Sequence, residues 1–384
     1  PPGPVVAHWL SWQFFTALGP VTDAVAMPLR TLQCHNPGLM ALDNAQIASA
    51  VAGMMLPLIG GLAVWPLFAW GKRVAGSKAA AVAALLFPIL PLFAMWPAQW
   101  DQIYPLLLLT GLYLAHTGLA SRPSTALRSA QEATSMSAWR VFLAGVPLSI
   151  ASFFSVGNFV LMVIVGLYGA VWLMMRRMNS AADRSSRLKP TSTVLDVLKF
   201  GTTLAVGSLS IWIVYAVIYG VNPLDVIATG SRLAFESTTG HRIYGTWLSG
   251  NPLDFAVFLG MPLVVALLAG LVSGRDDKPT EVGSYVMLSV ATFGTLLALI
   301  VSGIVRGEVG RLWMYFGPLM ALIVAQRITH YSLRITHYSS LITNHRPVLT
   351  SHVSLLSSQF PVSGTQHSVL RTQHCCFLTS HFAV

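Results

Sequence analysis

The 384-residue chain has few charged side chains, which is the first clue to the environment it occupies. Only 9% of its residues are Asp, Glu, Lys or Arg, whereas 54% are hydrophobic. Soluble domains carry about a quarter charged residues, so this chain lacks the polar surface needed to cover a water-soluble globule of its size. The composition therefore excludes a soluble enzyme and predicts an integral membrane protein.

The sequence also lacks the motifs of common catalytic and cofactor sites. Its three cysteines, Cys34, Cys375 and Cys376, show neither a disulfide framework nor zinc-ligand spacing. There is no Gly-rich phosphate loop, HExxH or GxSxG. The net charge is +10. Because these charges fall between apolar runs, membrane orientation explains them better than a nucleic-acid partner does.

Long apolar runs are abundant instead, and many approach the roughly 20 residues that cross a hydrocarbon core. None alternates apolar and polar residues as barrel strands do. We therefore predict an all-α, polytopic transmembrane helix bundle of about nine spans. The predicted spans are Gln46–Trp70, Ala79–Trp96, Gln102–Ala120, Arg140–Phe154, Asn158–Met175, Phe200–Gly220, Phe255–Val272, Tyr285–Ile304 and Leu312–Gln326.

Basic residues divide unevenly between the two sets of alternating loops. Fourteen lie on the side of the Gly71-Lys-Arg73 turn and the 176–199 loop, and five lie on the other side, with the C-terminal tail left out. Because Lys and Arg remain in the cytoplasm, we predict a multi-pass plasma-membrane protein. Residues 1–45, the Pro97–Asp101 turn, the Val221–Asp254 loop and the Val305–Arg311 turn then face outside.

The two ends of the chain differ from this central domain, predicted at 46–326. Residues 1–45 form a predicted outer-face segment, in which Val5–Leu18 is too short to span and suits a helix in the interface. Residues 327–384 hold seven of the eleven histidines and no Asp, Glu or Lys, and begin with RITHYSL repeated at a period of seven. A His-rich metal tract is one interpretation. A disordered tail of translated repetitive DNA fits the composition better.

Polar groups suited to chemistry gather on the predicted outer side. The candidate site residues are Asp101, His241, Arg242, Tyr244, Arg306, Glu308 and Arg311. Arginines at one membrane face suit an anionic ligand such as a lipid phosphate. The alternative is a simple ion pair within the loops, because charged clusters are often structural.

The interiors of the predicted spans offer little else that is ionisable. They lack Asp, Glu, Lys and Arg, and His116 is the one ionisable residue well inside a span. It is most simply a helix-end residue bonded to a neighbouring carbonyl. Ion-coupled transporters usually place such groups near the membrane midplane, so this absence disfavours that class.

Several short segments, taken in order, resemble the GT-C class of membrane glycosyltransferases. Within that class the resemblance is to the bacterial group related to glycosyltransferase family 39 and the aminoarabinose and protein-mannosyl transferases. It covers Pro1 to about Gln326. The segments that carry it are Pro1-Pro-Gly-Pro4, Gly71-Lys-Arg73, Trp100-Asp101-Gln-Ile-Tyr104, His241-Arg242-Ile-Tyr244-Gly-Thr-Trp247, Asn251-Pro-Leu-Asp254-Phe255 and Arg306-Gly-Glu308-Val-Gly-Arg311-Leu-Trp313.

The resemblance implies an enzyme that moves a sugar from a polyprenyl-phosphate donor to a hydroxyl of a lipid, glycan or protein at the extracytoplasmic face. Its partners would be the lipid bilayer and the polyprenyl-phosphate-linked sugar. An acidic residue would deprotonate the acceptor, and cationic side chains would stabilise the departing phosphate. No cofactor is certain, but some members use a divalent metal.

The sequence departs from this family in one respect that matters for catalysis. The acidic pair credited with catalysis in the family precedes the Pro-Pro-Gly segment, so we expect it upstream of Pro1 and leave the catalytic residues unassigned. Asp23 and Asp43 lie downstream of that place, and we do not assign them as the base. The chain is then a catalytically incomplete fragment. Two alternatives stay open: a transporter or flippase for a lipid-linked substrate, and a non-catalytic, degenerate membrane protein.

Overall fold

The computed structural model describes residues 2–31, 37–96, 99–120, 136–182, 193–272, 279–307 and 309–330. The chain divides into two units, Pro1–Thr329 and His330–Val384, and the helices discussed below form the first unit. The predicted tail, apart from its first four residues, lies outside the described residues.

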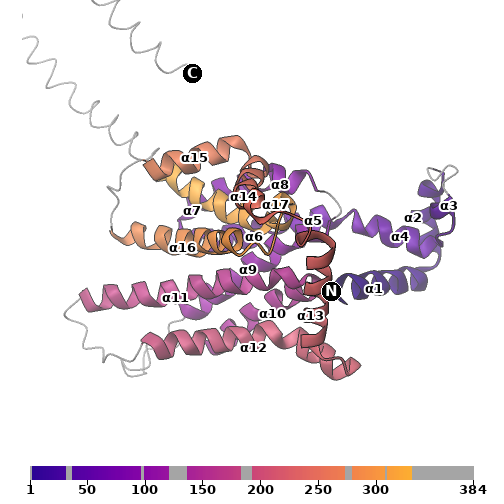
Figure 1. Ribbon diagram of the computed structural model, residues 1–384, viewed down its shortest axis with the longest axis horizontal. Helices are drawn as coiled ribbons and strands as arrows, with labels where there is room; N and C mark the ends of the chain where they lie inside the picture. The colour runs from indigo at the N-terminus through magenta and orange to yellow at the C-terminus, as the bar shows by residue number, and fades with distance from the viewer. Residues whose placement is uncertain are drawn as a thin grey trace, which may run out of the picture. The chain divides into compact units, whose positions relative to one another are not determined.

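Every secondary-structure element in the described residues is a helix, which confirms the predicted all-α class (Figure 1). The first part comprises α1 Pro2–Leu18, α2 Pro20–Arg30, α3 Pro37–Met40, α4 Asn44–Gly53, α5 Leu56–Gly61, α6 Val64–Val74, α7 Ser77–Leu86, η1 Phe87–Ile89, α8 Pro91–Ala94, η2 Trp100–Ile103 and α9 Tyr104–Leu119. The second part comprises α10 Ala138–Phe154, η3 Val156–Asn158, α11 Phe159–Ala182, α12 Thr193–Tyr219, α13 Pro223–Ala234, the π-helix η4 Phe235–Thr239, α14 Tyr244–Leu259, α15 Met261–Val272, α16 Pro279–Ser302, α17 Val309–Leu312 and η5 Met314–Phe316, followed by a helix over residues 317–330.

Three helical stretches among the described residues are long and apolar enough to cross a membrane. These are Asn44–Val74, which joins α4, α5 and α6, together with Val156–Met178 and Val194–Tyr219. A fourth span exists if the bent pair α14 and α15 counts as one. The other predicted spans correspond to helices that are broken or that fall short of this length in the described residues, among them Ser77–Ile89, Ala138–Phe154 and Val286–Ser302.

The predicted span Phe255–Val272 is wrong as a continuous helix, because the chain bends by 108° between α14 and α15. Gly260 adopts φ +93°, and its N–H bonds to the carbonyls of Ala256 and Val257. Glycine reaches this left-handed conformation without steric cost and ends α14. Pro262 then occupies the first turn of α15, where its missing N–H is harmless.

The predicted span Ala79–Trp96 is also interrupted, at Leu90. This residue has an extended backbone, with ψ 134°, between η1 and α8. A residue that precedes proline is driven out of the helical region, and Pro91 follows Leu90. The helix that begins at Ser77 therefore ends at Ile89.

The helices packed against α9 alternate in direction, as their contacts show. Gly60 and Arg73 contact Gln102 and Tyr113 respectively, so the α4–α6 stretch and α9 are parallel. By contrast, Gly118 of α9 packs on Val141 near the start of α10. Further along, Gly111 packs on Leu148 of α10, so α9 and α10 are antiparallel. Successive predicted spans thus reverse direction.

The pair α10 and α12 is parallel and packs with unusual closeness through two glycines. A Cβ on Gly145 would lie 2.5 Å from the backbone nitrogen of Ser208, and one on Gly207 would collide with the carbonyl oxygen of Phe142. Ser149 accepts a hydrogen bond from the backbone N–H of Ile211 at 3.0 Å. Such small-residue contacts bring helix backbones together where lipid supplies no hydrophobic driving force.

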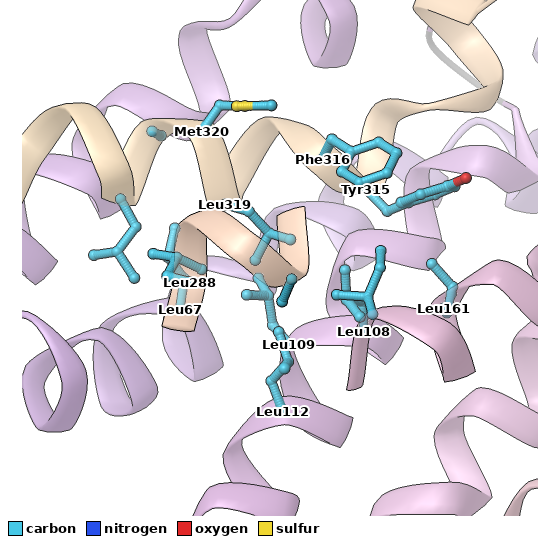
Figure 2. Close-up of a cluster of buried hydrophobic side chains, with 14 of the residues drawn as sticks. Leu67, Leu108, Leu109, Leu112, Leu161, Leu288, Tyr315, Phe316, Leu319 and Met320 are labelled. Carbon is cyan, nitrogen blue, oxygen red and sulfur yellow. The ribbon is translucent and has the colours of Figure 1, made fainter. Parts of the chain in front are cut away.

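Leucine and aromatic side chains fill the centre of the bundle (Figure 2). They come from α6, α9, α11, α16, η5 and the helix 317–330, and include Leu67, Leu108, Leu109, Leu112, Leu161, Leu288, Phe316 and Leu319. Large apolar side chains also remain on the outside, with Trp65 and Val217 each 79% exposed. Apolar residues on both the inside and the outside of a helix bundle are typical of helices surrounded by lipid.

Candidate functional site

Asp101 lies in η2, directly before α9, and forms an ion pair with Arg311 of α17. The Nε atom of Arg311 lies 3.3 Å from Oδ2 of Asp101, and the two side chains are 32% and 13% exposed. The pair therefore joins two segments far apart in the sequence in a partly buried setting. Attraction between the charges is stronger there than at an open surface.

Other polar side chains surround this ion pair. Tyr104 begins α9, interacts electrostatically with Asp101 and Arg311, and hydrogen-bonds the side chain of Asn158. Tyr315 of η5 also lies within electrostatic range of Asp101. Asn158 in turn donates a hydrogen bond to the carbonyl of Ala151, at 3.0 Å. This group of polar side chains therefore links four separate segments at one end of the bundle.

Arg242 and Arg306 form a second cluster. The guanidinium of Arg242 donates to the carbonyl of Arg306, and Nη1 of Arg306 donates to the carbonyl of Arg242 at 2.6 Å. Arg306 also donates to the carbonyls of Thr239, at 3.2 Å, and Gly303, at 3.1 Å. These contacts fasten the turn after α16 to the segment between η4 and α14.

Aromatic side chains support both arginines of this cluster. The Cζ atom of Arg242 lies 5.5 Å from the ring centroid of Trp247, and that of Arg306 lies 5.5 Å from the ring of Tyr244. Tyr244 also donates its hydroxyl to the carbonyl of Val301 at 2.6 Å. Cation–π contacts at this range fix the planes of the guanidinium groups.

Asn251 is a buried residue of this site that belongs to a segment carrying the family resemblance but was not among the candidate site residues. Its Nδ2 donates to the carbonyl of Val305 at 2.6 Å, and its Oδ1 accepts from the N–H of Gly307 at 2.9 Å. One amide thus satisfies both backbone groups of a turn in which Gly307 has φ +88°. The signal available in the sequence was an asparagine directly before a predicted apolar span, since a polar group that becomes buried needs partners.

The structure brings the predicted site residues together in two groups. Asp101 joins Arg311, while Arg242, Tyr244 and Arg306 form the second cluster; the short segment from Arg306 to Arg311 connects the groups. His241 is exposed in the turn before Arg242. Glu308 lies outside the described residues, so its predicted ion pair with either arginine stays a prediction.

A different set of charges lies at the other end of α9. Arg73 of α6, Arg140 of α10 and Arg176 of α11 all reach the last turns of α9. This places them with the residues predicted to be cytoplasmic, at the opposite end of α9 from Asp101. The two ends of the helix thus separate the predicted inner and outer charges.

His116, in the last turn of α9, lies at a helix end as expected but has a different partner. Its Nδ1 is 2.7 Å from the hydroxyl of Tyr168 in α11. Tyr168 packs edge-on against Trp70 with ring centroids 5.6 Å apart. This contact links α9 to α11, and Arg176 of α11 reaches Leu119 further along, so the two helices run parallel here.

The described residues at the Asp101 end of α9 offer few ligands for a divalent metal, which the family resemblance left open. Among the described residues, no group of three or more His, Cys, Asp or Glu side chains is placed to hold a metal ion. The carboxylate of Asp101 faces Arg311, and divalent cations prefer several oxygen ligands.

Comparison with known proteins gives limited similarity. No family model and no curated protein matches the sequence. The fold is similar to the crystal structure of the Archaeoglobus fulgidus oligosaccharyltransferase in complex with Zn and sulfate, with a TM-score of 0.38 and 14% sequence identity. That match covers 86% of this chain and 42% of the archaeal one, so this chain spans less than half of its length.

Proposed function

We propose that this chain is the membrane part of a glycosyltransferase that uses a polyprenyl-phosphate-linked sugar at the extracytoplasmic face of the plasma membrane. The observation that carries the proposal is the pairing of Arg311 with Asp101 at the end of α9 opposite the Arg73, Arg140 and Arg176 end. Arginine is the side chain best suited to hold a phosphate in a defined orientation.

The two clusters would have different roles, one in shaping the turn and the other in binding the donor phosphate. Arg242 and Arg306 are occupied with backbone carbonyls and give the turn its shape, although Nη2 of Arg306 makes no hydrogen bond within the described residues. Arg311, which is about a third exposed, is better placed to contact a donor phosphate. Asp101 would orient its guanidinium and keep it extended while no donor is bound.

Departure of a polyprenyl phosphate places negative charge on its oxygens, and a fixed guanidinium stabilises that charge. Tyr104 and Tyr315 lie close enough to Asp101 to belong to the same polar group. The base that deprotonates the acceptor is not assigned to any of these residues. Asp101 faces a cation, which makes it a poor proton acceptor.

The polar residues within the bundle support a transferase over an ion-coupled transporter. His116 is the ionisable residue within the predicted spans, and it hydrogen-bonds Tyr168 near the Arg73 end. Coupling ions need charged or strongly polar ligands near the midplane, and the described helices place their charges at the two ends.

Binding of undecaprenyl phosphate to the purified chain in detergent tests the proposal. We expect Arg311→Ala to weaken binding at least tenfold without loss of folding, and Arg311→Lys to restore it in part, because a point charge cannot reproduce a planar two-pronged contact. The matched control is Arg232→Ala, since Arg232 is an exposed cation on α13. Equal binding by the wild type and Arg311→Ala would overturn the proposal.

A further inference from the structure

Three arginines from three helices gather at the C-terminal end of α9, far from the candidate site. Arg73 contacts the hydroxyl of Tyr113 at 3.4 Å, Arg140 contacts the carbonyl of Thr117 at 3.4 Å, and Arg176 contacts the carbonyl of Leu119 at 3.5 Å. We call Arg73, Arg140 and Arg176 the arginine collar. The last carbonyls of a helix lack intrahelical partners, which explains why Arg140 and Arg176 turn toward them.

We propose that the arginine collar binds the phosphate headgroup of an anionic glycerophospholipid. Each of the three lies on a different helix, α6, α10 and α11, so together they surround the end of α9 with positive charge. All three residues are exposed. A phosphate can therefore approach them from outside the bundle.

Aromatic rings hold two of the collar arginines in place. The Cζ atom of Arg73 lies 5.0 Å from the ring of Tyr113, and that of Arg176 lies 5.2 Å from the ring of Trp172. Tyrosine and tryptophan favour the depth at which lipid headgroups lie. A guanidinium resting on such a ring is placed at the level of a lipid phosphate.

The surroundings of the collar favour a lipid over a free phosphate ion. Trp139 beside Arg140 and Met174 near Arg176 are 66% and 51% exposed, so the flanking helix faces are apolar. Acyl chains can cover these faces while the phosphate contacts the arginines. Basic groups between helices at the cytoplasmic side are suited to anionic headgroups in this way.

The test uses the purified full chain, freed of lipid in detergent, and measures its Tm with added phosphatidylglycerol or phosphatidylcholine of the same acyl chains. At a lipid concentration about 100-fold above Kd, we expect phosphatidylglycerol to raise Tm by about 5 °C. Phosphatidylcholine and inorganic phosphate should give no comparable shift. A larger response to inorganic phosphate than to the lipid, or equal responses to the two lipids, would overturn the proposal.

Variants locate the effect at the collar. The combined change Arg73→Gln, Arg140→Gln and Arg176→Gln should abolish the phosphatidylglycerol shift, whereas Arg232→Gln at the other end should retain it. If the triple variant fails to fold, the wild type still decides the matter, because a headgroup contact must weaken as NaCl is raised. A shift insensitive to salt contradicts the inference. Donor binding through Arg311 is measured separately, so failure of one proposal leaves the other testable.

Discussion

Arg242 and Arg306 each donate a hydrogen bond to the backbone carbonyl of the other, across 64 positions of sequence. Two like charges held side by side repel each other, so the contacts with carbonyls must offset that repulsion. These reciprocal hydrogen bonds, which we call the Arg242–Arg306 clasp, connect the turn after α16 to the start of α14. It also keeps two cations beside the segment that ends in Arg311.

The clasp predicts a loss of stability when Arg306 is shortened. Arg306→Ala removes contacts with Gly303, Thr239 and Arg242, and hydrogen bonds from charged groups contribute about 1.5–3 kcal/mol each. We expect thermal unfolding in detergent to shift downward for Arg306→Ala, with Arg306→Lys in between. Arg232→Ala, which alters an exposed cation, is the control. An unchanged Tm for Arg306→Ala would show that the clasp does not stabilise the fold.

Asp101 and Arg311 should behave as a coupled pair. In a double-mutant cycle with Asp101→Asn and Arg311→Gln, we expect a coupling free energy of about 1–3 kcal/mol, because the pair is partly buried. The measurement is the free energy of unfolding of the four proteins in detergent. Additive single effects would mean that the two side chains do not interact in solution.

Close packing of α10 on α12 predicts a sharp difference between two glycines of the same helix. Gly207→Ala places a methyl group against the carbonyl of Phe142, whereas Gly201→Ala meets no atom within 4 Å. We expect Gly207→Ala to destabilise the protein by about 1–3 kcal/mol. Gly201→Ala should leave stability unchanged or raise it, since alanine is the better helix former. Equal effects of the two substitutions would argue against the close contact.

The uneven distribution of basic residues predicts the orientation of the protein. In a background with Cys34, Cys375 and Cys376 changed to Ser, a cysteine at Thr229 should react with impermeant thiol reagents in intact cells. A cysteine at Ser185, in the 176–199 loop, should react only after permeabilisation. The reverse pattern would invert the orientation and move the candidate site to the cytoplasmic side.

Removal of residues 331–384 should leave membrane insertion and Tm nearly unchanged. That region contains no Asp, Glu or Lys and is rich in Ser, Thr and His, so it cannot bury enough apolar surface to offset the entropy of ordering it. The deletion begins at 331 because the last described helix runs to His330, beyond the predicted boundary at Gln326. Removal from Arg327 would shorten that helix, and provides the comparison. A large fall in Tm for the 331–384 deletion would show that the tail packs.

The sequence was sufficient for the helical class and for the two-ended distribution of charge, because both depend on composition and on alternation of loops. The sequence did not predict which of the spans are broken into two helices. Hydropathy counts apolar residues and does not register that Gly260 and Pro262 together turn the chain, or that Pro91 forces Leu90 out of the helix. Those signals were present but local, and the apolar run concealed them.

Pairing within the candidate site was harder to anticipate for a different reason. Among the described residues, Arg311 pairs with Asp101, which lies 210 positions earlier in the sequence. The packing of the helices between Asp101 and Arg311 determines which side chains meet, and separation along the sequence does not reveal that packing. Asn251 was not among the candidate site residues for the same reason, because its partners Val305 and Gly307 belong to a turn beyond α16.

The parallel packing of α10 on α12 constrains the order in which the chain can be assembled. Ser149 and Ile211, which hydrogen-bond across this interface, are 62 positions apart, and the whole of α11 lies between them. Until α12 has been synthesised, Gly145 has no partner and the close backbone contact with Ser208 cannot form. Closure of this interface thus waits for three consecutive helices, α10, α11 and α12, and α10 cannot reach its final packing while the chain ends before Ile211.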